Sequence, residues 1–233
     1  MEKIVILTGA GISAESGLDT FRDEDGLWSR HRIEDVATPE AFARDPGLVQ
    51  AFYNMRRREA AKARPNAAHE ALARLMQAYQ GDVVLVTQNV DDLHERAGSQ
   101  GVIHMHGHLR GALCAACGHR WLAPEEMATG EACPSCNQAT ARPDVVWFGE
   151  IPYQMDEIYD HLSEATLFAA IGTSGQVYPA AGFVIEAKAA RAYTVELNLE
   201  TSDVTSAFAE IRTGPATQIV PAWVDDLLSD RTS

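Results

Sequence analysis

Short apolar runs alternate with longer stretches of helical pattern along most of the chain. Each run has the length of a strand and leads into a loop rich in Gly, Thr, Ser or Asn. Such near-continuous apolar runs are typical of a parallel sheet that is covered on both faces. We therefore expect strands at residues 3–7, 82–87, 102–105, 167–171, 193–197 and 217–220.

The stretches between these runs place apolar residues at helical spacing. We expect helices at 66–79, 179–190 and 221–230, the first with Asn66 as its N-cap. Alternating strands and helices predict an α/β fold, a Rossmann-like parallel sheet with helices on both faces. In such folds ligands bind beyond the carboxyl ends of the strands, which is where the polar loops of this chain fall.

Two segments do not follow the alternation. Residues 29–65 have a largely helical pattern with no clear strand, and residues 111–144 have few apolar residues but hold all four cysteines. We interpret both as insertions that together form a smaller domain. The Rossmann-like core then comprises about 1–28, 66–110 and 145–233.

A glycine loop follows the first predicted strand. Gly9, Gly11 and Ala14 form a G-x-G-x-x-A pattern, in which glycines allow backbone amides to approach a pyrophosphate. The alternative is a tight turn without a ligand. No clear second strand ends in an acidic residue about 20 positions later, as a dehydrogenase requires. Asn198 is instead a candidate for the adenosine ribose.

The cysteines form two C-x-x-C pairs separated by 15 residues: Cys114, Cys117, Cys133 and Cys136. Two such pairs can complete a tetrahedral zinc site. A redox pair, a disulfide or unrelated buried thiols are the alternatives. Four protein ligands leave no open position on the metal, so we expect a structural zinc.

Gln88, Asn89 and Asp91 come directly after a predicted strand and are expected to face the cleft. The alternative is helix capping, by Asp91 or by Asp92.

Three histidines follow at alternating positions, His104, His106 and His108. In a strand they would share one face, which suggests a second metal site. His106 also precedes Gly107 at the end of an apolar strand, where a neutral imidazole could serve as a general base. A purely structural histidine is the alternative.

Tyr53 and Arg56 stand three residues apart in the helical segment and therefore share a helix face. That face either packs and is solvated, or it holds an acidic group. Arg57 and Arg58 lie on other faces and are expected to be solvated.

Composition narrows the class of protein. Of 233 residues, 46% are hydrophobic and 22% charged, and the formal net charge is −14. Such a charge disfavours nucleic acids and anionic membranes as partners. No apolar run is long enough for a bilayer span or a signal peptide. We expect a monomeric cytoplasmic protein, with no regulatory extension before the first strand.

Taken together, these segments resemble the sirtuins, and among them the bacterial, CobB-type class III members. "GAGISAESGLDTFR", "TQNVDDLHERAG", "HMHGHL", the cysteine pairs, "VVWFGE" and "GTSGQVYPAAG" occur in the sirtuin order, from end to end of the chain. The resemblance implies one catalytic domain over residues 1–233. It also implies an enzyme that consumes NAD to remove acetyl, succinyl or malonyl groups from lysine, producing nicotinamide and O-acyl-ADP-ribose.

The resemblance also assigns residues. His106 would act as general base on a ribose hydroxyl, and Asn89 would be the second catalytic residue. Contacts to NAD would come from Gly9, Ala10, Gly11, Glu15, Phe21, Arg22, Trp28, Gln88, Asn89, Asp91, Gly172, Thr173, Ser174, Asn198, Glu200 and Ala216.

On the substrate side, the resemblance places Tyr53 and Arg56 at the carboxylate of an acidic acyl group. The substrate protein would bind as an extended peptide, along Val146, Phe148, Gly149, Val177 and Tyr178. Ala37 and Ala41 would widen the acyl channel. Asp19 departs from the apolar residue or proline usual in sirtuins, and we expect it to face solvent.

Three other functions compete with deacylation. The same NAD site could support mono-ADP-ribosyl transfer to protein. An ordinary NAD dehydrogenase is disfavoured by the missing ribose acid. A non-enzymatic, zinc-bearing interaction protein is disfavoured by the complete set of nucleotide and base residues.

Overall fold

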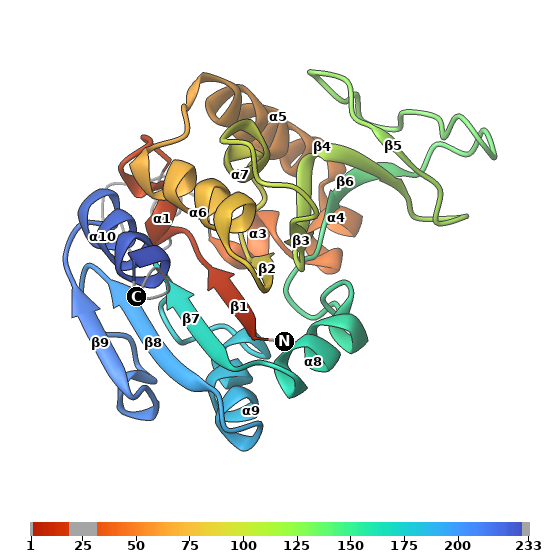
Figure 1. Ribbon diagram of the computed structural model, residues 1–233. Helices are drawn as coiled ribbons and strands as arrows, with labels where there is room; N and C mark the ends of the chain where they lie inside the picture. The colour runs from red at the N-terminus through yellow and green to blue at the C-terminus, as the bar shows by residue number, and fades with distance from the viewer. Residues whose placement is uncertain (1, 19–31, 230–233) are drawn as a thin grey trace.

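A computed structural model describes residues 2–18 and 32–229 of the protein (Figure 1). In this part of the chain, a parallel sheet has the strand order β3-β2-β1-β7-β8-β9. Its strands are β1 Lys3–Thr8, β2 Asp82–Thr87, β3 Ile103–His104, β7 Leu167–Ile171, β8 Tyr193–Asn198 and β9 Glu210–Thr213. The expected Rossmann-like parallel sheet is confirmed.

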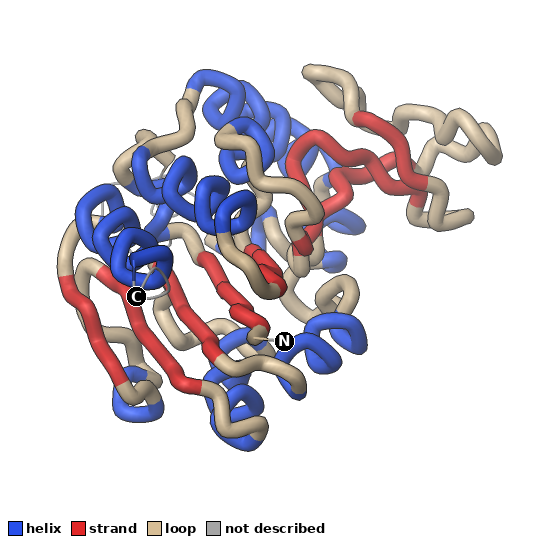
Figure 2. The backbone as a smooth tube through the Cα atoms, viewed as in Figure 1, coloured by secondary structure: helices blue, strands red, loops and turns tan. Residues whose placement is uncertain are grey.

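Helices cover both faces of the sheet (Figure 2). Alternate residues of β1 point to opposite sides: Ile4 and Ile6 pack with α6 and α10, whereas Val5 and Leu7 pack with α8 and α9. This two-sided burial explains why the central strands read as continuous apolar runs. The helices are α1 Gly11–Ala14, α3 Ile33–Val36, α4 Pro39–Arg44, α5 Pro46–Lys62, α6 Ala67–Ala78, α7 Leu93–Arg96, α8 Met155–Ser163, α9 Phe183–Ala189 and α10 Ala216–Ser229.

The N-terminus of α6 shows the expected cap. The Asn66 side chain accepts a hydrogen bond from the Ala68 amide at 2.9 Å, and the Asn66 amide donates to Nδ1 of His69 at 3.3 Å. Together these bonds form a reciprocal capping box, which satisfies amides that the first helical turn leaves unpaired. The prediction of Asn66 as N-cap is confirmed.

The predicted strand at 217–220 is wrong. These residues belong to α10, where Val220, Trp223 and Val224 are buried at helical spacing, and Pro221 lies inside the helix. Four apolar-rich residues before a proline do not distinguish a strand from a helix. The last strand is β9, in which partly buried and exposed residues alternate, so it has no apolar run in the sequence. The strand expected at 102–105 is shorter in the structure, where it is β3.

Next to the sheet lies a smaller module of helices and antiparallel strands. The described residues of the 29–65 segment hold α3, α4 and α5 and no strand, as predicted. The cysteine segment contributes an antiparallel sheet of order β5-β4-β6. Its strands are β4 Gly107–Cys114, β5 Arg120–Leu122 and β6 Ala141–Val145. The domain boundaries drawn from the sequence remain a prediction.

One face of α5 docks on the cysteine segment. The Asn54 side chain exchanges two hydrogen bonds with the backbone of Met127, at 3.0 and 2.9 Å. Arg57 donates to the Leu109 carbonyl at 3.3 Å and to Asn54. Arg57 is only 7% exposed, so the expectation that it is solvated is wrong. A sequence pattern cannot show carbonyls that come from a distant segment.

Among the described residues, no helix has the length and apolar character needed to cross a membrane.

The structure predicts effects of very different size on stability for substitutions at the two neighbouring arginines of α5. Arg57→Met should lower the free energy of unfolding by roughly 2–3 kcal/mol, because buried carbonyls lose a charged donor. Arg58 pairs with Glu126 at the surface, so Arg58→Met should change the free energy of unfolding by less than about 0.5 kcal/mol. Urea unfolding of both variants measures the difference, and equal values would contradict the assigned role of Arg57.

Candidate active site

The strand order reverses between β1 and β7, and a crevice opens beyond their carboxyl ends. The loops after these strands touch through their backbones: the Gly11 amide donates to the Gly172 carbonyl at 2.9 Å. Gly172 has a φ of +63°, and a Cβ there would lie 2.4 Å from the Ile12 nitrogen. Only glycine allows this close approach.

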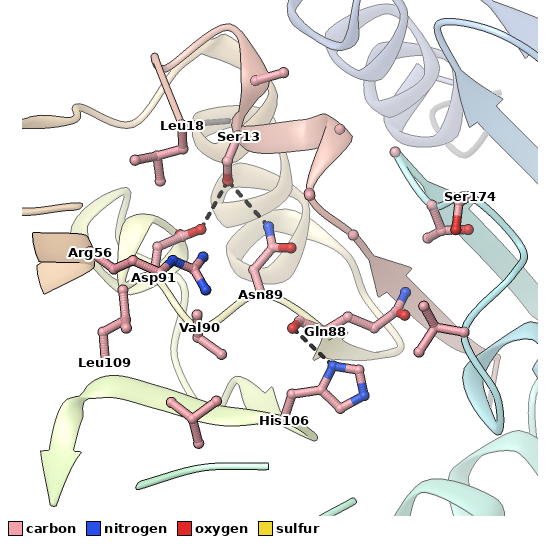
Figure 3. Close-up of a pocket in the computed structure, with 18 of the residues that line it drawn as sticks. Ser13, Leu18, Arg56, Gln88, Asn89, Val90, Asp91, His106, Leu109 and Ser174 are labelled. Atoms are coloured by element: carbon pink, nitrogen blue, oxygen red, sulfur yellow. Dashed lines mark hydrogen bonds between the residues drawn. The ribbon is translucent and has the colours of Figure 1, made fainter. Parts of the chain in front are cut away.

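A cavity of about 680 Å³ lies at this crevice and extends toward α5 (Figure 3). It gathers the predicted catalytic, NAD-binding and substrate-binding residues that fall within the described part of the chain. They are Gly9, Ala10, Gly11, Glu15, Tyr53, Arg56, Gln88, Asn89, Asp91, His106, Val146, Phe148, Gly149, Gly172, Thr173, Ser174, Val177, Tyr178, Asn198, Glu200 and Ala216. Phe21, Arg22, Trp28 and Asp19 lie outside the described residues.

Buried hydrogen bonds join the loops after β1 and β2 through Ser13 (Figure 3). Its hydroxyl donates to Oδ2 of Asp91 at 3.2 Å and accepts from Nδ2 of Asn89 at 3.2 Å. This bond uses one of the two N–H donors of Asn89 and fixes the orientation of its amide, which can present its other N–H and its Oδ1 to a ligand. Sequence reasoning missed Ser13, although a polar residue inside the glycine loop is a signal for it.

His69 completes this network from α6. Its Nδ1 accepts from the Asn66 amide, so Nε2 carries the proton and donates to Ser13 Oγ at 3.4 Å. Burial lowers the pKa of His69 to about 4, which keeps the ring neutral at physiological pH. Burial also raises the pKa of Asp91, while hydrogen bonds from Leu93 and Ser13 oppose that rise.

His106 follows β3 and lies across the cavity from the glycine loop (Figure 3). Its Nδ1 lies 3.1 Å from the Gln88 carbonyl, which can only accept, so Nδ1 carries the proton. The lone pair is therefore on Nε2. Burial lowers the pKa of His106, so the ring is neutral at physiological pH and can accept a proton.

The prediction of a second metal site at three histidines is wrong. His104 lies in β3, His106 in the following turn and His108 in β4, so they do not share the face of one strand. Asp91, rather than Asp92, accepts a hydrogen bond at the start of α7, from the Leu93 amide at 3.1 Å.

Tyr53 and Arg56 reach the same cavity from α5. Tyr53 is 1% exposed, and its hydroxyl accepts from Nε1 of Trp147 at 2.9 Å. Burial raises the pKa of Tyr53 to about 12, so the phenol keeps its own proton. Ala37 lines the cavity, whereas Ala41 is fully buried in the neighbouring core.

Trp147 is itself held by an ion pair. Arg142 stacks over its ring at 3.5 Å and binds both carboxylate oxygens of Glu150, at 2.6 and 2.9 Å. The charged fork and the stacked ring fix the wall of the cavity next to Tyr53. Trp147 belongs to the segment "VVWFGE", but the sequence did not predict a role for it.

On the opposite side of the cavity, polar side chains brace the loops after β7 and β8. Asn198 donates to the Thr173 carbonyl at 2.7 Å. The carboxylate of Glu15 accepts from the amide and the hydroxyl of Thr217, at 2.9 and 2.7 Å. These bonds join the glycine loop to α10 around the predicted adenosine end.

The four cysteines form the group of potential metal ligands found among the described residues. None is in a disulfide, and their sulfur atoms lie within 4.8 Å of one another. Cys114 and Cys136 are 3.6 Å apart, and Cys117 and Cys133 are 3.8 Å apart. Zn–S bonds of about 2.3 Å in a tetrahedron require sulfurs about 3.8 Å apart. The ligand set fits zinc and leaves no open position.

Strand order, glycine loops and cavity define a nucleotide-binding α/β protein. Comparisons with known proteins narrow this class. The model of the Sir2 family matches residues 9–179. Two relatives are named NAD-dependent protein deacylase, one from Vibrio parahaemolyticus and one from Salmonella typhimurium. Each is 57% identical to this chain over 229 residues, which is 97% of this chain. The match covers 95% of the Vibrio protein and 84% of the Salmonella protein.

Two solved structures illustrate the likeness. A Sir2 homologue in complex with NAD has a TM-score of 0.90 at 38% identity, covering 99% of this chain and 91% of that one. Sir2 with a p53 peptide and NAD⁺ has a TM-score of 0.78 at 28% identity, covering 96% and 92%. The chain belongs to the Sir2 family.

The cysteine geometry predicts one zinc ion per chain. Cys133→Ser should lose the metal and lower the melting temperature by roughly 10 °C or more, because metal binding contributes directly to folding. Ser135→Ala, two residues away, should keep both the metal and the stability. Elemental analysis and thermal unfolding test this, and a Cys133→Ser variant with full zinc content would refute it.

Proposed function

We propose that the protein is an NAD-dependent protein lysine deacylase that removes acetyl, succinyl and malonyl groups. The products are nicotinamide, O-acyl-ADP-ribose and free lysine. One observation carries the proposal: a single cavity is lined by the glycine loops, by a neutral histidine and by a tyrosine–arginine pair. The names of the relatives at 57% identity support deacylation over mono-ADP-ribosyl transfer.

The residues present fit NAD. The crevice beyond β1 and β7 brings glycine backbones close together, and Asn198 and Glu200 lie beside the predicted adenosine end. When bound, NAD supplies a ribose carbon from which nicotinamide can depart. Asn89 and Asp91, held by Ser13, bind and orient the nicotinamide half, and the enclosed walls limit access of water.

His106 acts as the general base. Its Nδ1–H is engaged by the Gln88 carbonyl, so Nε2 is available to take the proton of a ribose hydroxyl. The lowered pKa keeps Nε2 unprotonated at physiological pH.

Tyr53 and Arg56 bind the carboxylate of a succinyl or malonyl group. The Tyr53 oxygen accepts from Trp147, so its own O–H is the donor that remains for a ligand. Arg56, one helical turn away, supplies the positive charge that a carboxylate needs in a partly apolar channel. Ala37 leaves room beside them.

The acyl-lysine arrives on an extended peptide. Phe148 and Tyr178 expose 43% and 73% of their surfaces at the cavity, which supports binding of a peptide between their two segments.

We further infer a monomer that works in the cytoplasm. Four free thiols arranged for zinc require a reducing compartment, and a net charge of −14 opposes self-association.

Arg56→Met tests the pocket for acidic acyl groups. Removal of succinyl groups should fall roughly 10- to 100-fold in kcat/KM, because a buried carboxylate loses its charged donor. Removal of acetyl groups from the same peptide should change less than about threefold. Arg58→Met, on the exposed face of α5, is the control. Equal losses on both peptides would give Arg56 a structural role.

His106→Ala tests the general base. NAD-dependent release of both acyl groups should fall by about 10²- to 10⁴-fold, while binding of the acetylated peptide persists. Product analysis by mass spectrometry measures the release. Substantial O-acyl-ADP-ribose from the variant would contradict the assignment.

A further inference from the structure

Two histidines bracket the loop after β2 by binding consecutive carbonyls. His106 holds the Gln88 carbonyl, and Nδ1 of His104 lies 3.2 Å from the Asn89 carbonyl. Nothing in the proposed reaction assigns a role to His104. Its side chain is 13% exposed and faces away from the cavity residues toward α7.

The second nitrogen of His104 has a partner of a different kind. Nε2 lies 2.7 Å from Oε1 of Glu95, on α7. A backbone carbonyl and a carboxylate are both acceptors, so each ring nitrogen must donate a proton to keep its bond. Both bonds exist together only when His104 is an imidazolium. His106 has one such bond and is neutral, so the two histidines differ in charge.

The groups around His104 favour the charged ring. Burial lowers the pKa of His104. The hydrogen bond and charge of Glu95, the Asn89 carbonyl and the charge of Asp91 all raise it, and together they outweigh burial. The pKa of His104 is therefore raised above its ordinary value. From α7, His94 is neutral, with a strongly lowered pKa. From β4, the His108 ring lies 5.9 Å away, also with a lowered pKa. Neither histidine adds a competing positive charge near neutral pH.

We propose that His104, held by Glu95, is a positioning residue that fixes the loop of Gln88, Asn89 and Asp91 for catalysis. This inference rests on the proposed deacylase function. His104 acts through the Asn89 backbone, while Ser13 holds the Asn89 side chain. Asn89 is thereby held through its backbone and its side chain, and the loop remains in place for the nicotinamide half of NAD.

The arrangement predicts an alkaline limit to activity. As pH rises through the raised pKa of His104, the ring loses one proton. The remaining N–H stays with the carboxylate, which is the stronger acceptor. The lone pair of Nδ1 then faces the Asn89 carbonyl oxygen, and repulsion displaces the loop. The acid limb belongs to His106, whose lowered pKa places it at lower pH.

The test measures kcat/KM for NAD-dependent deacetylation of one acetyl-lysine peptide between about pH 5.5 and 9.5, a range that brackets the ordinary histidine pKa. In the wild type, kcat/KM should fall roughly tenfold across the alkaline limb, the size of one charge-assisted hydrogen bond. Glu95→Gln should move that limb at least about one pH unit lower, because the stabilising charge is lost. His104→Asn offers an amide donor that does not titrate, and should remove the limb.

His108→Gln is the matched control, because His108 is an exposed residue of β4 whose ring lies close to that of His104. Its alkaline limb should stay in place. An alkaline limb that is unchanged in both Glu95→Gln and His104→Asn would overturn the proposal.

Nitrogen-detected NMR of the histidine rings gives a reading that does not depend on activity. His104 should be protonated on both nitrogens at pH 7.0, and His106 on Nδ1 alone. A neutral His104 at that pH would overturn the inference even if the enzyme deacylates lysine. A charged His104 in a protein without NAD-dependent deacylation would instead refute the proposed function.

Discussion

The backbone contact between the loops after β1 and β7 is the constraint on which the site depends. Gly11 and Gly172 lie so close that neither can carry a side chain without a collision with the other loop. The contact falls where the strand order reverses, so the two halves of the sheet are joined at the floor of the cavity. A nucleotide can approach backbone amides there because no Cβ stands between them.

Polar contacts connect these glycine loops to each other and fix the other walls of the cavity. Ser13 joins the β1 loop to the β2 loop, and two histidines contact consecutive carbonyls of the β2 loop. On the far wall, Trp147 links Tyr53 to the Arg142–Glu150 pair. Asn89, His106 and Tyr53 are therefore each oriented by a hydrogen bond with a neighbouring segment, as a preorganised site requires.

Much of this could be predicted from the sequence, and the exceptions have physical reasons. Buried strands and the Asn66 cap leave local patterns in the sequence, and the spacing of the cysteines predicts the four metal ligands. The edge strand β9 leaves no apolar run, because only alternate residues are partly buried. The burial of Arg57 depends on the Leu109 carbonyl, 52 residues away. Trp147 and His104 gain their roles from partners that folding alone brings together. The polar position of Ser13 in the glycine loop is a local signal, but it does not reveal the partners of Ser13 on the β2 loop.

The helix α5 separates two tasks by face. Asn54 and Arg57 bind the cysteine segment, while Tyr53 and Arg56 line the cavity. Under the proposed function, substitution of Arg56 would alter the choice of acyl group while the contacts that dock the helix persist. Tyr53 differs, because it is also buried in the core next to Trp147 and contributes to packing. The proposed acyl preference could therefore be changed at Arg56, on a support whose stability is set by other positions of the same helix.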